Sequence, residues 1–80
     1  MNENLENEFA ELLEPNQNIL HKICRIYTVD DDSRKDLFQE MVIQLWRAYP
    51  SFRADTKFST WAYRICLKTA ITLFRNNKSV

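Results

Sequence analysis

The chain has 80 residues and a formal net charge of zero, with 11 basic and 11 acidic side chains, no glycine and two prolines. This length indicates one small domain with a modest core, and 45% hydrophobic against 28% charged residues excludes an intrinsically disordered chain. No stretch approaches the roughly 20 apolar residues of a membrane span, and the acidic N-terminus lacks the basic start of a signal peptide. We therefore expect a cytoplasmic protein.

The lack of glycine favours helices joined by short loops. Apolar side chains at helical spacing predict a first helix over residues 3–13. Pro15 interrupts this pattern, and because proline is tolerated in the first turn of a helix, a second helix is predicted from there to about Tyr27.

Residues 29–33 predict a loop that ends in an N-cap at Ser33, with Asp36 in the place of the capping-box acid. The third helix then runs to Tyr49, where Pro50 stops it, because the residue before a proline avoids the helical region.

Residues 50–57 form the one substantial loop, and Thr56 is expected to cap a fourth helix over about 57–76. The predicted fold is all-α, a small bundle of three to four helices. We expect a single domain over residues 1–80, in which residues 1–14 form an N-terminal helix or extension.

The net charge of zero hides a division between the two halves of the chain. Residues 1–40 hold ten acidic and four basic side chains, a net −6, and residues 41–80 hold seven basic and one acidic, a net +6. Such asymmetry suggests two working surfaces of opposite charge.

The predicted fourth helix carries bases that no acid on the same helix neutralises, in a narrow sector with Trp61 at its margin. A basic stripe with aromatic neighbours is typical of surfaces that bind phosphates and unstacked bases. The alternative is a solubilising face that packs near the acidic half. The stripe contains Lys57, Thr60, Arg64, Lys68 and Arg75. The side chains expected to face the core are Phe58, Ala62, Ile65, Cys66, Ala70 and Leu73.

The third helix has a broad apolar arc and, opposite it, a polar stripe that contains one apolar residue, Ile43. A single exposed isoleucine is common in soluble proteins. The other interpretation is an apolar anchor within an acidic protein-binding surface. The remaining members of the stripe are Asp36, Gln39, Glu40 and Arg47.

Nothing in the sequence points to catalysis, a metal or a cofactor. His21 is the only histidine and lacks partners at metal-ligand spacing, and no glycine is present to build a phosphate loop. Cys24 and Cys66 are too few for the disulfide framework of a small secreted domain. They lie among apolar neighbours at helical spacing, so we expect both to be reduced core residues. Because no catalytic group of residues is found, we expect no enzyme activity.

Three segments together resemble region two of bacterial RNA polymerase sigma factors, most closely those of the extracytoplasmic-function group. The resemblance covers residues 15–77, nearly the whole chain, and the pair D-L-x-Q-E and F-S-T-W is its specific part. The segments are DLFQEMVIQLW (36–46), AYPSFR (48–53) and KFSTWAYRICLKTAITLFR (57–75).

In this family the D-L-x-Q-E helix docks on the coiled coil of the largest subunit of core RNA polymerase. The resemblance therefore implies a polymerase contact at Asp36, Gln39, Glu40 and Ile43. Acidic residues at such an interface aid orientation and association rate more than affinity.

The F-S-T-W loop and helix of the family melt and read the minus-ten promoter element during transcription initiation. The resemblance implies that the unwound non-template strand is held here, with a flipped base in a pocket formed by the 50–57 loop and the start of the fourth helix. The implied DNA-binding residues are Arg53, Lys57, Ser59, Thr60, Trp61, Tyr63, Arg64 and Lys68, with Arg75 completing the basic stripe.

The chain departs from the family in two ways. Arg64 and Ile65 stand where housekeeping sigma factors carry a tryptophan pair that wedges the duplex open. The C-terminal domain that reads the upstream promoter element is absent, so we expect a fragment of a longer protein. An anti-sigma factor is a further implied partner. The alternative function is a helical interaction module whose basic face binds an acidic protein, without nucleic acid.

Overall fold

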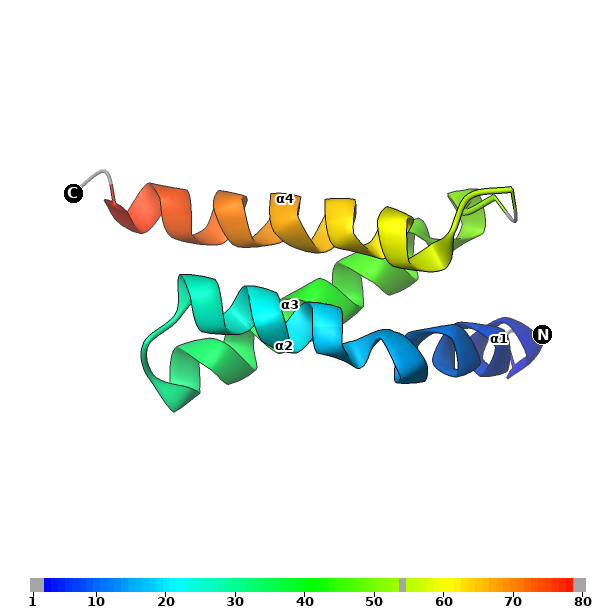
Figure 1. Cartoon of the computed structure of the whole chain (residues 1–80), viewed down its shortest axis with the longest axis horizontal. Helices are drawn as coiled ribbons and strands as arrows, with labels where there is room; N and C mark the ends of the chain where they lie inside the picture. The colour runs from blue at the N-terminus through cyan, green and yellow to red at the C-terminus, as the bar shows by residue number, and fades with distance from the viewer. Residues whose placement is uncertain (1–2, 54, 79–80) are drawn as a thin grey trace.

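The protein is all-helical, as predicted. The structure, a computed structural model, describes the backbone of residues 3–53 and 55–78 and the side chains of residues 4–53 and 55–74, and that part of the chain contains no strand (Figure 1). The elements in chain order are α1 (Glu3–Leu13), a 3-10 turn (Glu14–Asn16), α2 (Gln17–Tyr27), α3 (Asp31–Ala48), a second 3-10 turn (Tyr49–Ser51) and α4 (Phe58–Lys78). Within these residues, no helix is both long enough and apolar enough to cross a membrane.

Helices α2, α3 and α4 contact one another pairwise and form the body of the molecule. Figure 1 shows α4 lying along one side of this bundle, with α2 and α3 on the other side. Helix α1 lies roughly in line with α2, next to the N-terminal end of α2. The molecule is elongated as a result, with principal extents of 42 × 21 × 21 Å.

The core is built from apolar side chains that recur every three or four residues on each helix, the spacing that aligns them on one face. On α4 these positions carry the small residues Ala62, Cys66 and Ala70, all fully buried. Small side chains at a helix contact shorten the distance between helix axes, so α4 packs closely against α2 and α3. The other buried apolar residues are Phe9, Leu20, Ile23, Cys24, Leu37, Met41, Leu45, Tyr49 and Phe58.

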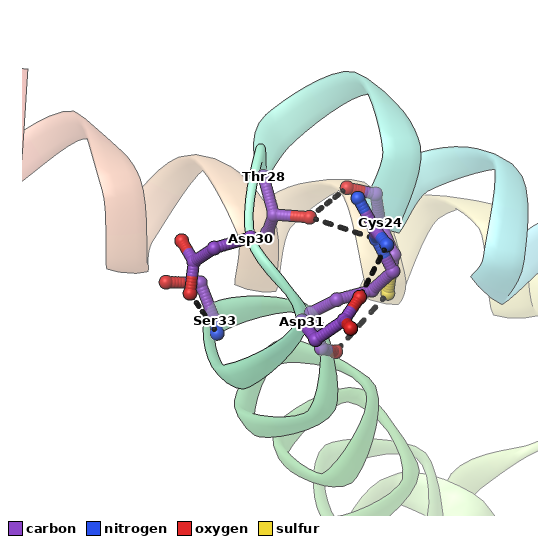
Figure 2. A network of polar contacts seen from close by, with 6 residues as sticks. Cys24, Thr28, Asp30, Asp31 and Ser33 are labelled. Atoms are coloured by element: carbon purple, nitrogen blue, oxygen red, sulfur yellow. Dashed lines mark hydrogen bonds and ion pairs between the residues drawn. The ribbon is translucent and has the colours of Figure 1, made fainter.

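A polar network fixes the corner between α2 and α3 (Figure 2). The buried Thr28 hydroxyl donates to the Cys24 carbonyl oxygen at 2.6 Å and accepts from Arg34 Nε at 3.3 Å. Arg34 also forms an ion pair with Asp31, with 3.1 Å between Nη1 and Oδ1. These bonds satisfy the polar atoms of a chain reversal that uses no glycine.

Two predicted helix caps are wrong. Asp30, not Ser33, caps α3: its Oδ2 accepts the Ser33 backbone N–H at 2.9 Å (Figure 2), so the helix begins at Asp31. At the start of α4 the Lys57 carbonyl oxygen accepts the first helical hydrogen bond, from the Trp61 N–H at 3.1 Å, so Lys57 and not Thr56 is the residue before the first turn. The Thr56 hydroxyl instead lies 3.5 Å from Asp55 Oδ1.

One predicted core position on α4 is also wrong. Leu73 has the right helical phase but remains 40% exposed. It lies in the later part of the 21-residue α4, and the 18-residue α3 crosses α4 at an angle (Figure 1), so α3 does not cover this part of α4 completely.

We predict that replacing Asp30 with alanine lowers the midpoint of thermal unfolding at neutral pH. The N–H of Ser33 donates to the Asp30 carboxylate and, as the largest cause, holds the pKa of that carboxyl below its usual value. A carboxyl with a lowered pKa stabilises the fold above its unfolded-state pKa, and this contribution is lost as the pH falls through the folded-state pKa. The difference between wild type and Asp30→Ala, measured by circular dichroism, should therefore shrink in acid.

Asp30→Asn is the matched control, because an asparagine side chain caps helices about as well as aspartate and does not titrate. It should resemble the wild type at neutral pH and keep its cap in acid. If Asp30→Ala unfolds at the wild-type temperature at neutral pH, the assignment of the cap is wrong.

The two cysteines are free and buried, as predicted. Burial raises the pKa of both thiols, that of Cys66 to about 12. A thiol reagent reacts with the thiolate, so we predict slow labelling of both thiols at pH 8 and fast labelling in urea above the unfolding midpoint. Mass spectrometry of the labelled chain checks this, and rapid labelling of either thiol without urea would contradict the packing described.

Candidate functional site

A basic stripe runs along the side of α4 that faces away from the core. We define the basic stripe as Lys57, Thr60, Arg64 and Lys68, and all four side chains are exposed. Successive residues of an α-helix are about 100° apart, so Arg64 and Lys68 lie about 40° from each other and the members share one side of the helix. Among the described residues, the single ion pair joins Arg34 and Asp31, so no carboxylate neutralises the stripe.

The other residues of α4 that were expected to bind DNA lie around this stripe or apart from it. Trp61 is half-buried at the margin of the stripe, as predicted. Tyr63 is 48% exposed, but it lies about 100° from Arg64 and lines a small hollow with Asn18 and Lys22 of α2. Ser59 is half-buried on the same side as Tyr63. The Arg75 side chain lies outside the described residues.

Aromatic rings hold the segment that leads into α4, of which the structure describes residues 50–53 and 55–57. The Phe52 ring lies 4.9 Å from that of Trp61 and 5.6 Å from that of Phe58, between ring centroids, and it stacks on Tyr49 at 5.9 Å. The Thr56 N–H donates to the Arg53 carbonyl oxygen at 3.0 Å and closes a turn.

Arg53 and Lys57 are both exposed on this segment, so their charges adjoin the first turn of α4. We call the complete set of packed rings the aromatic cluster: Phe9, Trp46, Tyr49, Phe52, Phe58 and Trp61.

A second exposed surface lies on α3 and carries acidic and apolar side chains together. The outer face of α3 consists of Asp36, Gln39, Glu40 and Ile43, of which Glu40 alone is half-buried. Ile43 is 48% exposed, so the interpretation that it lies outside the core holds. The Glu40 carboxylate accepts from Gln44 Nε2 at 2.8 Å, which fixes the direction of the acid.

A groove of about 380 Å³ separates α3 from α4 and links the two surfaces. Glu40 lines it from the outer face of α3, and Lys68 lines it from the basic stripe. Ile65 and Ala48 also line it and contribute apolar surface. Sequence patterns did not predict this groove, because it forms only where two separate helices meet. The remaining lining residues are Gln44, Thr69, Thr72 and Leu73.

A broader cleft of about 570 Å³ lies between α1 and the segment before α4. Leu5, Glu8 and Leu12 line it from α1, and the facing wall includes Pro50 and Phe52. The other lining residues are Tyr49, Thr56 and Phe58. The sequence did not predict that α1 lines this cleft. The spacing of its apolar residues shows that one face is buried, but it does not show which element covers that face.

Within the described part of the chain, no group of three or more His, Cys, Asp or Glu side chains is arranged to hold a metal ion. Neither cysteine has the lowered pKa of a reactive thiol, because burial raises the pKa of both. The geometry offers two exposed surfaces of different character: a cationic one next to aromatic rings, and an acidic one that includes the apolar Ile43.

Comparison with known proteins finds the family that the three segments resemble. The family model for sigma-70 region 2 matches residues 12–80. The ECF RNA polymerase sigma-E factor of Escherichia coli K12 is 40% identical over 52 residues, which is 62% of this chain and 27% of that protein. The RNA polymerase sigma-H factor of Pseudomonas aeruginosa is 40% identical over 53 residues, 62% of this chain and 28% of that protein.

The match thus spans little more than a quarter of the length of these relatives. No solved structure matches the chain significantly. The matched residues include the whole outer face of α3, the basic stripe and the segment between them. The chain therefore belongs to the sigma-70 region 2 family, as a domain of the extracytoplasmic-function group.

Proposed function

We propose that this chain is the module of a transcription initiation factor that binds core RNA polymerase and captures the non-template strand of the minus-ten promoter element. The observation that carries the proposal is the basic stripe, Lys57 just before α4 and three exposed positions on α4, which forms no ion pair among the described residues. The relatives that the chain matches are named as RNA polymerase sigma factors, which supports the same function.

Phosphate contacts from the basic stripe position the single strand, and base contacts select its sequence. Arg53 extends this cationic surface beyond Lys57, along the segment before α4. Extruding one base from the duplex costs a few kcal/mol, and stacking one base on an aromatic ring returns about 1–3 kcal/mol. Because these terms nearly cancel, the phosphate contacts decide the net affinity, which should be modest for this chain alone.

The outer face of α3 is the proposed contact for the coiled coil of the largest polymerase subunit. Ile43 supplies an apolar anchor, and Asp36 and Glu40 supply negative charge that orients a basic partner. The groove between α3 and α4 places Glu40 and Lys68 on opposite walls, so polymerase and promoter strand would be held on adjacent sides of one helix pair.

The proposal also includes a division of the chain, in which residues 1–14 form an N-terminal extension and residues 15–77 form the core of the domain. An anti-sigma factor that covers the two surfaces would inhibit both activities at once.

The basic stripe gives the first prediction for this function. Replacing Arg64 and Lys68 together with alanine should weaken binding to single-stranded promoter oligonucleotides and flatten its salt dependence. For every phosphate that the variant no longer neutralises, the slope of log affinity against log salt should become shallower by about 0.7. Fluorescence anisotropy across a salt series, with matched duplexes and scrambled strands, measures both quantities.

The control is Lys22→Ala with Arg25→Ala, which removes the same charge from exposed positions on α2. Equal reductions in affinity for the two double variants would show that net charge, not the stripe, sets the affinity. If the wild type prefers an acidic protein partner and ignores sequence in single strands, the DNA-binding proposal fails and the interaction-module alternative stands.

The outer face of α3 gives the second prediction. Ile43→Asp should weaken binding to core RNA polymerase by at least about 2 kcal/mol, roughly 30-fold, because it replaces the apolar anchor of the contact with a charge. Binding to single-stranded DNA should be unchanged, since Ile43 lies on α3 and not on the stripe. Competition for core polymerase against a labelled sigma factor provides the measurement.

Ile26→Asp is the matched control, an isoleucine on α2 that is 70% exposed and belongs to neither surface. It should bind polymerase like the wild type. Undiminished polymerase binding by Ile43→Asp would place the contact elsewhere on the molecule.

A further inference from the structure

Helix α1 contributes a buried ring to the aromatic cluster, although almost all of it precedes the family-matched segment 12–80. Phe9 is only 7% exposed. Its ring centroid lies 5.3 Å from that of Trp46, 5.3 Å from that of Tyr49 and 6.3 Å from that of Phe58. The edge-to-face arrangement with Tyr49 and Phe58 is one that aromatic pairs favour.

The same rings hold the segment that leads into α4. The backbone hydrogen bonds of this segment are local: Phe52 N–H donates to the Tyr49 carbonyl and Thr56 N–H to the Arg53 carbonyl. The Ser51 hydroxyl donates to the Ala48 carbonyl oxygen at 2.7 Å, and the Phe52 ring, packed on Tyr49, Phe58 and Trp61, ties the segment to α4. Two of those three rings are also in contact with Phe9.

Direct packing of α1 on the segment is loose by comparison. The cleft of about 570 Å³ separates Leu5 and Leu12 from Pro50 and Phe52. One long hydrogen bond crosses it, from the Tyr49 hydroxyl to Glu8 Oε1 at 3.4 Å. The position of the segment therefore depends on α1 mainly through the ring of Phe9.

We infer that α1 positions the strand-reading segment 50–57, and that Phe9 is the positioning residue, acting through Tyr49 and Phe58 on Phe52. This inference rests on the proposed function. It assigns a role in sequence selectivity to a helix that contributes no residue to the basic stripe or to the outer face of α3. Removal of the Phe9 ring should let the segment move while the rest of the bundle stays folded.

The test compares Phe9→Ala with a control variant on α2, Ile23→Val or Ile23→Ala, whichever matches its unfolding midpoint. Ile23 is 2% exposed in the core and takes no part in the aromatic cluster. The first measurement is the rate of native-state trypsin cleavage after Arg53 and Lys57, with products identified by mass spectrometry. The second is the ratio of affinities for the single strand that the wild type selects and a scrambled strand.

We expect Phe9→Ala to be cleaved at these two sites at least about tenfold faster than the stability-matched control, because local opening exposes a segment to protease without global unfolding. Its strand selectivity should fall, and the control should keep the wild-type ratio. Tyr49→Phe retains all the rings and should behave as the wild type in both measurements. If Phe9→Ala does not fold, Phe9→Leu removes the ring at similar volume and takes its place.

Cleavage and selectivity equal to those of the matched control would overturn the inference, since Phe9 would then contribute to stability alone. Faster cleavage with unchanged selectivity would also overturn it. A wild type that selects no strand would refute the proposed function instead, and the cleavage rates would still decide whether α1 positions the segment.

Discussion

The close approach of α4 to α2 and α3 depends on three small buried side chains, Ala62, Cys66 and Ala70, at four-residue spacing. They let one face of α4 lie close to two other helices. With that face committed to the core, the opposite side of α4 is exposed and carries the basic stripe. A larger residue at any of the three positions would move α4 outward and widen the groove that Glu40 and Lys68 line.

The sequence predicted the features that depend on contacts between residues close together in the chain, and it failed for those that depend on contacts between distant residues. Helical spacing sufficed for the four helices and the all-α class, because it reports local geometry. The caps were harder, since Asp30 and Ser33 are both good caps three residues apart and the corner network with Thr28 and Arg34 decides between them. Leu73 shows a further limit, because helical phase predicts which side a residue faces but not how far the neighbouring helices extend.

The candidate site divides in the same way. The outer face of α3 and the basic stripe each lie on a single helix, so their positions were predictable from phase, and the exposure of Ile43 agrees. Their roles in polymerase and DNA binding remain predictions. The contribution of α1 was not predictable, because Phe9 meets Trp46 and Tyr49 only after the chain has folded back over some forty residues.

The aromatic cluster determines which part of the molecule tryptophan fluorescence can monitor. The chain has two tryptophans, and both are in the cluster, Trp46 against Phe9 and Trp61 against Phe52. Tryptophan fluorescence therefore monitors only the end of the molecule where α1 meets the start of α4, whereas far-ultraviolet circular dichroism averages over every helix. Coincident transitions by the two probes would mean that this end unfolds with the bundle, and an earlier fluorescence transition would reveal it as a separate cooperative unit.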